Sequence, residues 1–114
     1  YQRVAQLYED ARHKLSMTNN FDAVLSGLDI LTLFFGFYYS TTPIEHYITE
    51  RELQKRNWRC DLSKKLWFQR KTSMPIQEGD GFEISNFLKF DAQFWSMGDL
   101  INFKLNYRDL SPPV

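Results

Sequence analysis

The chain has 114 residues, of which 43% are hydrophobic and 17% aromatic, and its formal net charge is zero. This length and apolar content are enough for one globular domain with its own core. A zero net charge gives no reason to expect a polyanionic partner for the chain as a whole, so charge has to be considered locally. Lys55–Lys71 holds seven basic residues and one acid, a net of +6, whereas Glu78–Asp99 has a net of −4. The sequence therefore predicts one basic and one acidic region.

The cysteine count and the length of the apolar runs indicate in which cellular environment the protein folds. Cys60 is the single cysteine, which excludes an internal disulfide and a cysteine-based zinc cluster. A reducing, intracellular setting fits this best. The most apolar run, Ile30–Tyr39, is interrupted by Thr32 and is far shorter than the roughly 20 residues that cross a bilayer, so no membrane partner is expected. The sequence opens directly in a helical pattern, and we expect it to be part of a longer protein.

The first segment is predicted to form an amphipathic helix that ends near Ser16. Its apolar residues recur at helical spacing, and they are Val4, Leu7, Tyr8, Ala11 and Leu15. The polar run Thr18–Asn20 follows and predicts a loop, because short polar side chains compete for backbone hydrogen bonds.

Two more helices are predicted before the middle of the chain. Asp29 can cap the run Ile30–Tyr39, whose apolar residues lie on all sides and indicate burial all round. Thr42–Glu45 has threonine at the N-cap, proline at the first helical position and glutamate at the third, which is the pattern of a capping box. The third helix is therefore expected to start there and to end at about Arg56.

After Asn57 the apolar period changes from helical to alternating, which predicts a β-hairpin with its turn at Ser63–Lys65. Trp58, Cys60 and Leu62 alternate with Arg59 and Asp61, and Leu66 and Phe68 alternate with Trp67 and Gln69. We expect the inward side chains to be Trp58, Cys60 and Phe68.

The remainder is predicted as a loop over Met74–Gly81, a strand over Asn86–Phe90, a capped turn over Asp91–Trp95 and a strand over Leu100–Tyr107. In the last strand one side would carry Ile101, Phe103, Leu105 and Tyr107. The fold class is α+β, with N-terminal helices followed by a small, strongly curved antiparallel sheet.

Catalytic and metal-binding patterns are not found. His13 and His46 do not have the spacing of a metal site, and Cys60 stands in a strand without the sequence signature of a nucleophile. The carboxylate pairs, such as Asp80 and Glu83, are not set in an apolar run that would separate their pKa values. We expect neither an enzyme nor a cofactor or metal.

The basic hairpin leaves two interpretations open. Basic residues interleaved with aromatic ones are typical of surfaces that bind single-stranded nucleic acid, and Trp67 could assist them by stacking. Alternation in a half-buried sheet is also common, with aromatics inward and charges merely solvated outside. On the first interpretation, the RNA-binding residues would be Lys55, Arg56, Arg59, Lys64, Lys65, Arg70 and Lys71.

Four motifs follow one another along the chain. They are LFFGFYYS at Leu33–Ser40, KRNWR at Lys55–Arg59, LWFQR at Leu66–Arg70, and FLKFD followed by FW at Phe87–Asp91 and Phe94–Trp95. This order resembles the NOT-box, the C-terminal domain of two non-enzymatic subunit types of the CCR-NOT complex, which deadenylates mRNA and represses gene expression. WFQR and the closing NYRDL, Asn106–Leu110, are more similar to the Not-three/Not-five type than to the Not-two type. The resemblance covers residues 29–110 and departs at Cys60-Asp61, where relatives carry an aromatic residue and a histidine.

The resemblance implies a helical connector, residues 1–28, and a NOT-box domain, residues 29–114, in which helices precede a small Sm-like or SH3-like β-barrel. It implies pairing with a Not-two-type NOT-box, docking of the pair on the Not-one scaffold, and an association with U-rich RNA. A subunit of this kind would act as a repressor in mRNA decay and transcription regulation, in the cytoplasm and the nucleus.

Excess aromatic surface and the resemblance together predict a partner-binding surface on the helices. Most of these residues would form the core, but obligate interfaces resemble a core cut in half, so some are available for a partner. The candidates are Val4, Leu7, Tyr8, Ala11, Leu15, Leu31, Phe34, Phe35, Phe37, Tyr38, Ile44, Tyr47 and Ile48.

Overall fold

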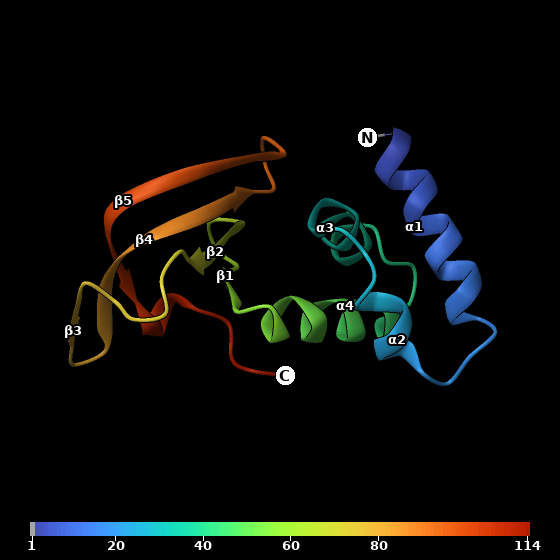
Figure 1. The fold of residues 1–114 in the computed structure, drawn as a ribbon, viewed down its shortest axis with the longest axis horizontal. Helices are drawn as coiled ribbons and strands as arrows, with labels where there is room; N and C mark the ends of the chain where they lie inside the picture. Colours follow the sequence, from blue (N-terminus) through green and yellow to red (C-terminus); the bar gives the residue numbers. More distant parts are fainter. Residues whose placement is uncertain (1) are drawn as a thin grey trace. The chain divides into compact units, whose positions relative to one another are not determined.

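The computed structural model describes residues 2–114, which form two compact units. The helical unit runs up to Arg56 and includes Val114, and the sheet unit comprises Asn57–Pro113. Helices that precede a five-stranded antiparallel sheet confirm the predicted α+β class (Figure 1). The units divide after Arg56, while the boundary expected at residue 28 remains a prediction. Among the described residues, no helix has the length and apolar character needed to span a membrane.

Four helices make up the helical unit: α1 (Gln2–Leu15), α2 (Phe21–Leu25), α3 (Ile30–Tyr38) and α4 (Pro43–Lys55). Three of them are the predicted helices. α2 is missing from the prediction, because five residues are too few to show a helical period. Its local signal is Asn20, whose side chain accepts a hydrogen bond from the backbone N of Ala23 at 3.2 Å, as an N-cap does.

The starts of α3 and α4 follow from the predicted caps. Asp29 accepts a hydrogen bond from the backbone N of Thr32 at 3.2 Å, and Thr42 Oγ1 accepts one from the backbone N of Glu45 at 3.2 Å. Pro43 takes the first position of α4, where a missing N–H leaves no hydrogen bond unmade. Both predicted start sites are confirmed.

Tyr8 joins α1 to α3 in the core of the helical unit. Its side chain is fully buried, and its ring lies so close to Gly36 that a Cβ added there would be 2.7 Å from Tyr8 Cδ1. The Tyr8 ring also lies 6.2 Å from that of Phe35, centroid to centroid. The bare backbone at Gly36 is therefore what lets α1 pack this closely against α3. The fully buried apolar side chains of the helical unit include Leu25, Leu33, Phe34 and Leu53.

β4 is the central strand of the sheet unit. Along one edge it pairs with β5, and along the other it pairs first with β3 and then with β2, which in turn pairs with β1. All of these pairings are antiparallel. The strands are β1 (Trp58–Asp61), β2 (Leu66–Arg70), β3 (Gln77–Gly79), β4 (Phe82–Asp91) and β5 (Ser96–Asn106), followed by a 3-10 turn, Tyr107–Asp109.

The sheet is open, so the expected Sm-like or SH3-like barrel is not confirmed. Within residues 2–114 no strand pairing connects β1 with β5. The chain beyond β5 does return to β1, where the backbone N of Ser111 donates to the carbonyl of Cys60 at 2.8 Å. Pro112 and Pro113 follow at once and have no N–H to donate, so this contact does not extend into a strand.

The stretch predicted as a loop contains β3, and β4 begins at Phe82 rather than Asn86. Gly79 pairs with Phe82, so Asp80 and Gly81 form the turn of a hairpin. Gly81 has a φ of 77°, a left-handed conformation that glycine adopts in turns without steric cost. The Asp-Gly dipeptide was the available signal for this hairpin.

The predicted face of β5 is wrong, because the strand contains a β-bulge. Ser85 pairs with Phe103 but Phe87 pairs with Leu100, so Asn86 opposes two residues, Ile101 and Asn102. Asn102 has a φ of 52°, and its backbone N donates to the side chain of Asn86 at 2.9 Å. The extra residue reverses the alternation, which leaves Ile101 exposed while Leu100 and Phe103 pack on the core.

Tyr107 was also wrongly placed in the last strand, because the chain has already entered the 3-10 turn there. The apolar cluster of this face consists of Phe68, Phe87 and Leu105, with Leu66, Leu100, Phe103 and Leu110 packed against them.

Both faces of the β1–β2 hairpin are buried. Trp58, Cys60 and Phe68 are buried as predicted, but Cys60 is the cross-strand neighbour of Trp67 while Phe68 is the neighbour of Arg59. Directly opposite residues share a face, so Trp58 and Cys60 lie on one face with Trp67, and Phe68 lies on the other. The expected outward position of Trp67 is therefore wrong, since its side chain is fully buried and cannot stack on a base. Leu62 lies in the turn and is exposed.

Replacing Gly36 by alanine should destabilise the chain by about 1–3 kcal/mol, because the new methyl group would overlap the buried Tyr8 ring. Gly27→Ala is the matched control, since the nearest atom to its added Cβ is Val24 O at 3.7 Å, and its effect should stay within about 0.5 kcal/mol. Urea unfolding of both variants measures the difference. Equal stability of the two variants would contradict the packing described for Tyr8.

Candidate partner-binding surface

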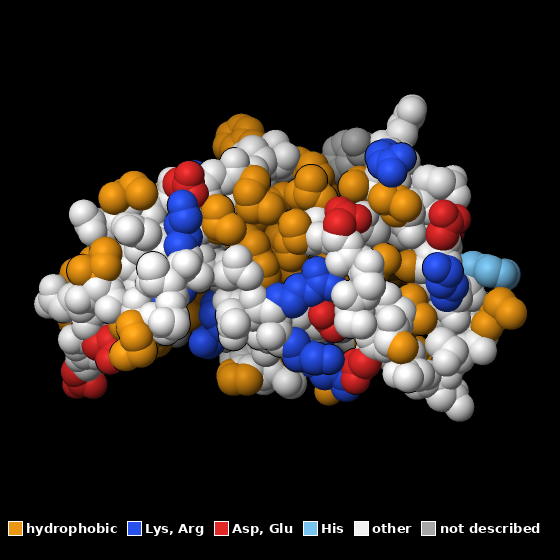
Figure 2. Space-filling model, in the orientation of Figure 1, with side chains coloured by type: hydrophobic (Ala, Val, Ile, Leu, Met, Phe, Trp, Pro, Cys, Tyr) orange, Lys and Arg blue, Asp and Glu red, His pale blue; other side chains and the backbone are white. Residues whose placement is uncertain are grey.

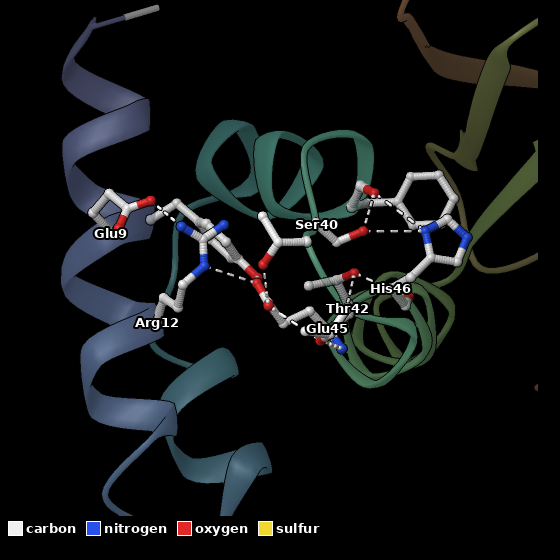
Figure 3. Close-up of polar contacts among 10 residues, drawn as sticks. Glu9, Arg12, Ser40, Thr42, Glu45 and His46 are labelled. Atoms are coloured by element: carbon white, nitrogen blue, oxygen red, sulfur yellow. Dashed lines mark hydrogen bonds and ion pairs between the residues drawn. The ribbon is translucent and has the colours of Figure 1, made fainter.

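Glu45 is the polar centre of the helical unit. It stands in the first turn of α4 and is 8% exposed. One carboxylate oxygen, Oε1, accepts hydrogen bonds from Tyr8 Oη at 3.0 Å and Arg12 Nε at 2.9 Å, both on α1. The other, Oε2, accepts from Thr41 Oγ1 at 2.9 Å and Thr42 Oγ1 at 3.2 Å (Figure 3). The glutamate of the predicted capping box thus also ties α4 to α1.

The surroundings of Glu45 keep it ionised. Burial by itself would raise the pKa of this carboxyl, but hydrogen bonds from Arg12, Thr41 and Tyr8 outweigh burial and hold the pKa below its ordinary value. Burial, together with the hydrogen bond to Glu45, raises the pKa of the Tyr8 hydroxyl. Arg12 also pairs with Glu9 and lies 5.0 Å from the centroid of the Tyr8 ring. The cluster is therefore a charged carboxylate held by a cation and three hydroxyl donors.

His46 has a structural place beside this cluster. Its ring stacks on Phe37 at 4.3 Å between centroids, and its Nδ1 lies 3.3 Å from the carbonyl oxygen of Phe37 and 3.4 Å from Ser40 Oγ (Figure 3). These contacts connect the end of α3 to α4. Among the described residues, no group of three or more His, Cys, Asp or Glu side chains lies together in a way that could hold a metal ion.

The predicted partner-binding residues divide into three groups by burial. The first group lies in the core of the chain and consists of Tyr8, Ala11, Leu15, Phe34, Phe37 and Ile48. The second group is half-buried: Val4, Leu7, Phe35 and Tyr38. The third group is exposed, and it consists of Leu31, Ile44 and Tyr47. Only the second and third groups offer surface to a partner in this structure.

Tyr39 and Met17 are exposed apolar residues of the helical unit that were not among the candidates. Tyr39 is 49% exposed and stacks on Phe35 at 4.6 Å between ring centroids, and Met17 is 75% exposed. Tyr39 ends the apolar run that the sequence already marked, so the run itself was its signal. Met17 follows the predicted end of the first helix and had no periodic signal.

Hollows in the surface of the helical unit are found among its described residues. A larger groove lies between α1 and the segment that contains α2, and its apolar lining includes Leu7, Ala11, Met17, Val24 and Leu28. A smaller hollow lies between α1 and α3 and is lined by Gln2, Ala5, Phe35 and Tyr39. The larger groove is also lined by polar residues such as Asp10, Lys14 and Asp29. Grooves with apolar side chains in their lining can accept side chains of another protein.

Most of the predicted RNA-binding cations already have acidic partners. Lys55 and Arg56 belong to the helical unit and the other five to the sheet unit. The ion pairs are Lys55 with Asp22 and Glu52, Arg56 with Glu52, Lys64 with Asp61, Arg70 with Glu83, and Lys71 with Asp99. In the described part of the chain, Arg59 and Lys65 form no ion pair. The net positive surface of the hairpin is therefore smaller than the sequence suggests.

Arg70 is half-buried and is bound to Glu83, a buried carboxylate of the sheet unit. Its Nε and Nη2 donate to the two carboxylate oxygens of Glu83 at 2.7 Å and 2.8 Å. Ser85 Oγ at 2.7 Å and Tyr107 Oη at 3.2 Å complete the donors to this carboxylate. The hydrogen bonds from Arg70, set against burial, lower the pKa of Glu83. This fork geometry fixes β2 to β4 and leaves Arg70 poorly placed to meet a phosphate.

Comparison with known proteins agrees with the four motifs. The sequence model of the family described as NOT2/NOT3/NOT5 C-terminal matches residues 1–110. General negative regulator of transcription subunit 3 of Saccharomyces cerevisiae is 31% identical over 87 residues, which are 76% of this chain and 10% of the relative. General negative regulator of transcription subunit 2 of the same organism is 39% identical over 66 residues, 56% of this chain and 35% of the relative. A Drosophila melanogaster protein named Regulator of gene activity is 34% identical over 73 residues, 63% of this chain and 12% of the relative.

These relatives are named as regulators rather than as enzymes, and the chain spans between 10% and 35% of their length. The matched stretch also takes in residues 1–28, which the motifs did not cover.

Glu45→Gln should lower the free energy of unfolding at pH 7 by about 1–3 kcal/mol, because a neutral amide cannot pair with Arg12 and leaves buried donors poorly matched. Glu9→Gln is the matched control: it removes the other acid bound to Arg12, but its side chain is 57% exposed, so its effect should stay below about 0.5 kcal/mol. Urea unfolding at several pH values measures both.

The effect of Glu45→Gln should depend on pH in one direction. The folded pKa of Glu45 lies below its ordinary value of 4.5, so the stabilisation is fully present above pH 4.5 and is lost as the pH falls through the folded pKa. The difference between parent and variant should therefore narrow in acid. A difference that stays constant from pH 7 to pH 3 would contradict the charged role of Glu45.

Proposed function

We propose, because the chain belongs to the NOT2/NOT3/NOT5 C-terminal family, that it is a non-catalytic interaction module of the CCR-NOT complex. In this proposal it heterodimerises with a Not-two-type NOT-box and docks with it on the Not-one scaffold. Its contribution to mRNA decay and to repression of transcription is then to hold other subunits together, in the cytoplasm and the nucleus.

The observation that supports this proposal best is the apolar surface of the helical unit. Ile44 is 61% exposed, Tyr47 is 47% exposed and Leu31 is 37% exposed, and apolar side chains reach the surface of this unit between charged ones (Figure 2). Ile44 and Tyr47 are one turn apart on α4, and Leu31 lies on α3. Exposed apolar patches are typical of protein–protein contacts, and aromatic side chains contribute strongly to them.

The frame beneath this surface is fixed. Ile44 and Tyr47 lie on α4 on either side of Glu45, whose carboxylate is bound by α1. Arg51 adds a contact from the same helix, with its guanidinium 5.5 Å from the Tyr47 ring centroid. A surface that is ordered before binding loses less conformational entropy when a partner docks.

RNA binding by the hairpin is an alternative proposal, and fewer residues support it than the sequence suggests. Arg59 and Lys65 are the predicted cations that keep their charge uncompensated in the described residues, and Trp67 is buried. Phosphate contacts by two cations would give weak, salt-sensitive binding. Partner binding therefore has the stronger support.

The test is to mix the 114-residue chain with a Not-two-type NOT-box at micromolar concentration and to measure mass by light scattering after size exclusion. A single peak with the mass of a 1:1 complex is expected, and two separate monomers would refute the proposal. Ile44→Asp should weaken the complex by at least about tenfold, as loss of a contact at an interface centre does.

Ile44→Asp is chosen because an acid in the first turn of a helix is compatible with the helix dipole, so the variant should fold. The matched control is Phe94→Asp, which removes an apolar side chain that is 73% exposed on the sheet unit. Equal loss of binding in the two variants would mean that the helical surface is not the specific contact.

A further inference from the structure

Two Ser/Thr-Pro dipeptides occur in the chain, Thr42-Pro43 and Ser111-Pro112, and the structure treats them differently. Thr42 is exposed, and so are Thr41, Pro43 and Ile44 around it. Ser111 is 7% exposed, and its backbone N is bound to the carbonyl of Cys60 at 2.8 Å. Of the two sequence-equivalent hydroxyls, one is open to a modifying enzyme and the other is enclosed.

The backbone at Thr42 also has the form that a kinase site accepts. Its φ is −135° and its ψ is 154°, which is extended conformation. The Thr42 hydroxyl makes local hydrogen bonds with Glu45. Its Oγ1 accepts one from the backbone N of Glu45 and donates one to the Glu45 carboxylate, both at 3.2 Å. Opening a single turn at the start of α4 therefore frees the residue.

We propose that Thr42 is a phosphorylation site for a proline-directed serine/threonine protein kinase, and that the phosphate loosens α1 from α4. In the reaction Thr42 Oγ1 forms a bond to the γ-phosphorus of ATP, the bond from that phosphorus to the β-phosphate oxygen breaks, and ADP leaves. The proton of the hydroxyl passes to the catalytic base of the kinase. This regulation goes beyond the proposed function and does not depend on it.

Loosening of α1 follows from the charges around Glu45. A phosphate carries about −1.5 to −2 charge at pH 7, and Thr42 Oγ1 lies 3.2 Å from the Glu45 carboxylate. The modification removes the hydroxyl donor of Thr42 and sets a like charge beside Glu45. Both changes weaken the bond between Glu45 and α1.

α4 itself is expected to tolerate the phosphate. An anion at a helix N-terminus interacts favourably with the helix dipole and with unpaired backbone N–H groups. The effect should therefore concentrate on α1. The same coupling acts in reverse, because separation of α1 releases Glu45 and with it the turn that contains Thr42, so modification and loss of α1 packing favour each other.

The first experiment treats the folded 114-residue chain with a cyclin-dependent kinase and Mg·ATP and maps phosphate by mass spectrometry. Synthetic peptides of residues 37–48 and 106–114 show whether the kinase accepts each dipeptide without the fold. We expect phosphate at Thr42 at least about tenfold faster than at Ser111 in the chain, and no phosphate at Thr42 in Pro43→Ala. Modification of Ser111 at an equal rate, or no modification of Thr42 in the chain, would overturn the proposal.

The second experiment compares amide hydrogen exchange in the unmodified and phosphorylated chains. The amides of Ala11–Leu15 on α1 should exchange at least about fivefold faster after phosphorylation, the lower end of ordinary coupling between sites, while those of Ile48–Leu53 on α4 should change less. Thr41→Val is the control, since it removes another hydroxyl bound to Glu45 at 2.9 Å without adding charge, and it should show a smaller increase. Unchanged exchange on α1, or loosening confined to α4, would overturn the second half of the proposal.

Discussion

The helical unit depends on the hydrogen bonds made by one carboxylate. Glu45 is fixed in the first turn of α4 by the Thr42 cap, and from there it accepts hydrogen bonds from Tyr8 and Arg12 on α1. A buried charge is tolerated only when donors surround it, so α1 has to stay within reach of α4. Gly36 holds α1 close to α3 in turn, because the Tyr8 ring fits only against a backbone without a Cβ. The exposed apolar residues of α4 are consequently presented on a fixed frame.

Most of the fold could be predicted where a pattern is long or a cap is local. Asp29 and Thr42 mark the starts of α3 and α4 because a capping side chain acts within three residues. The bulge at Asn102 could not be read from alternation, since one extra residue reverses every later side chain and is set by pairing with a distant strand. Whether the sheet closes depends on such pairings as well.

The amino-acid composition of the helices predicts that some aromatic side chains reach the surface. It does not predict which ones they are. The run that contains Phe34 and Phe37 has too many aromatic side chains for one face, yet both of these rings are buried while Tyr39 is exposed. Which aromatic faces outward depends on the direction from which α1 packs, and that direction is fixed by Tyr8. The net charge on the surface of the basic hairpin could not be predicted from the hairpin sequence either. The acids that pair with Arg70 and Lys71 lie on other strands.

The most direct test of the central claim, that Glu45 holds α1 on α4, is a double-mutant cycle between Arg12→Met and Glu45→Gln. Methionine keeps the apolar stem of the arginine, so the cycle isolates the charged contact. Unfolding free energies of the parent, both single variants and the double variant give the coupling. We predict a coupling of about 1 kcal/mol or more, as for residues that share a buried network. Effects that simply add, within about 0.3 kcal/mol, would contradict it.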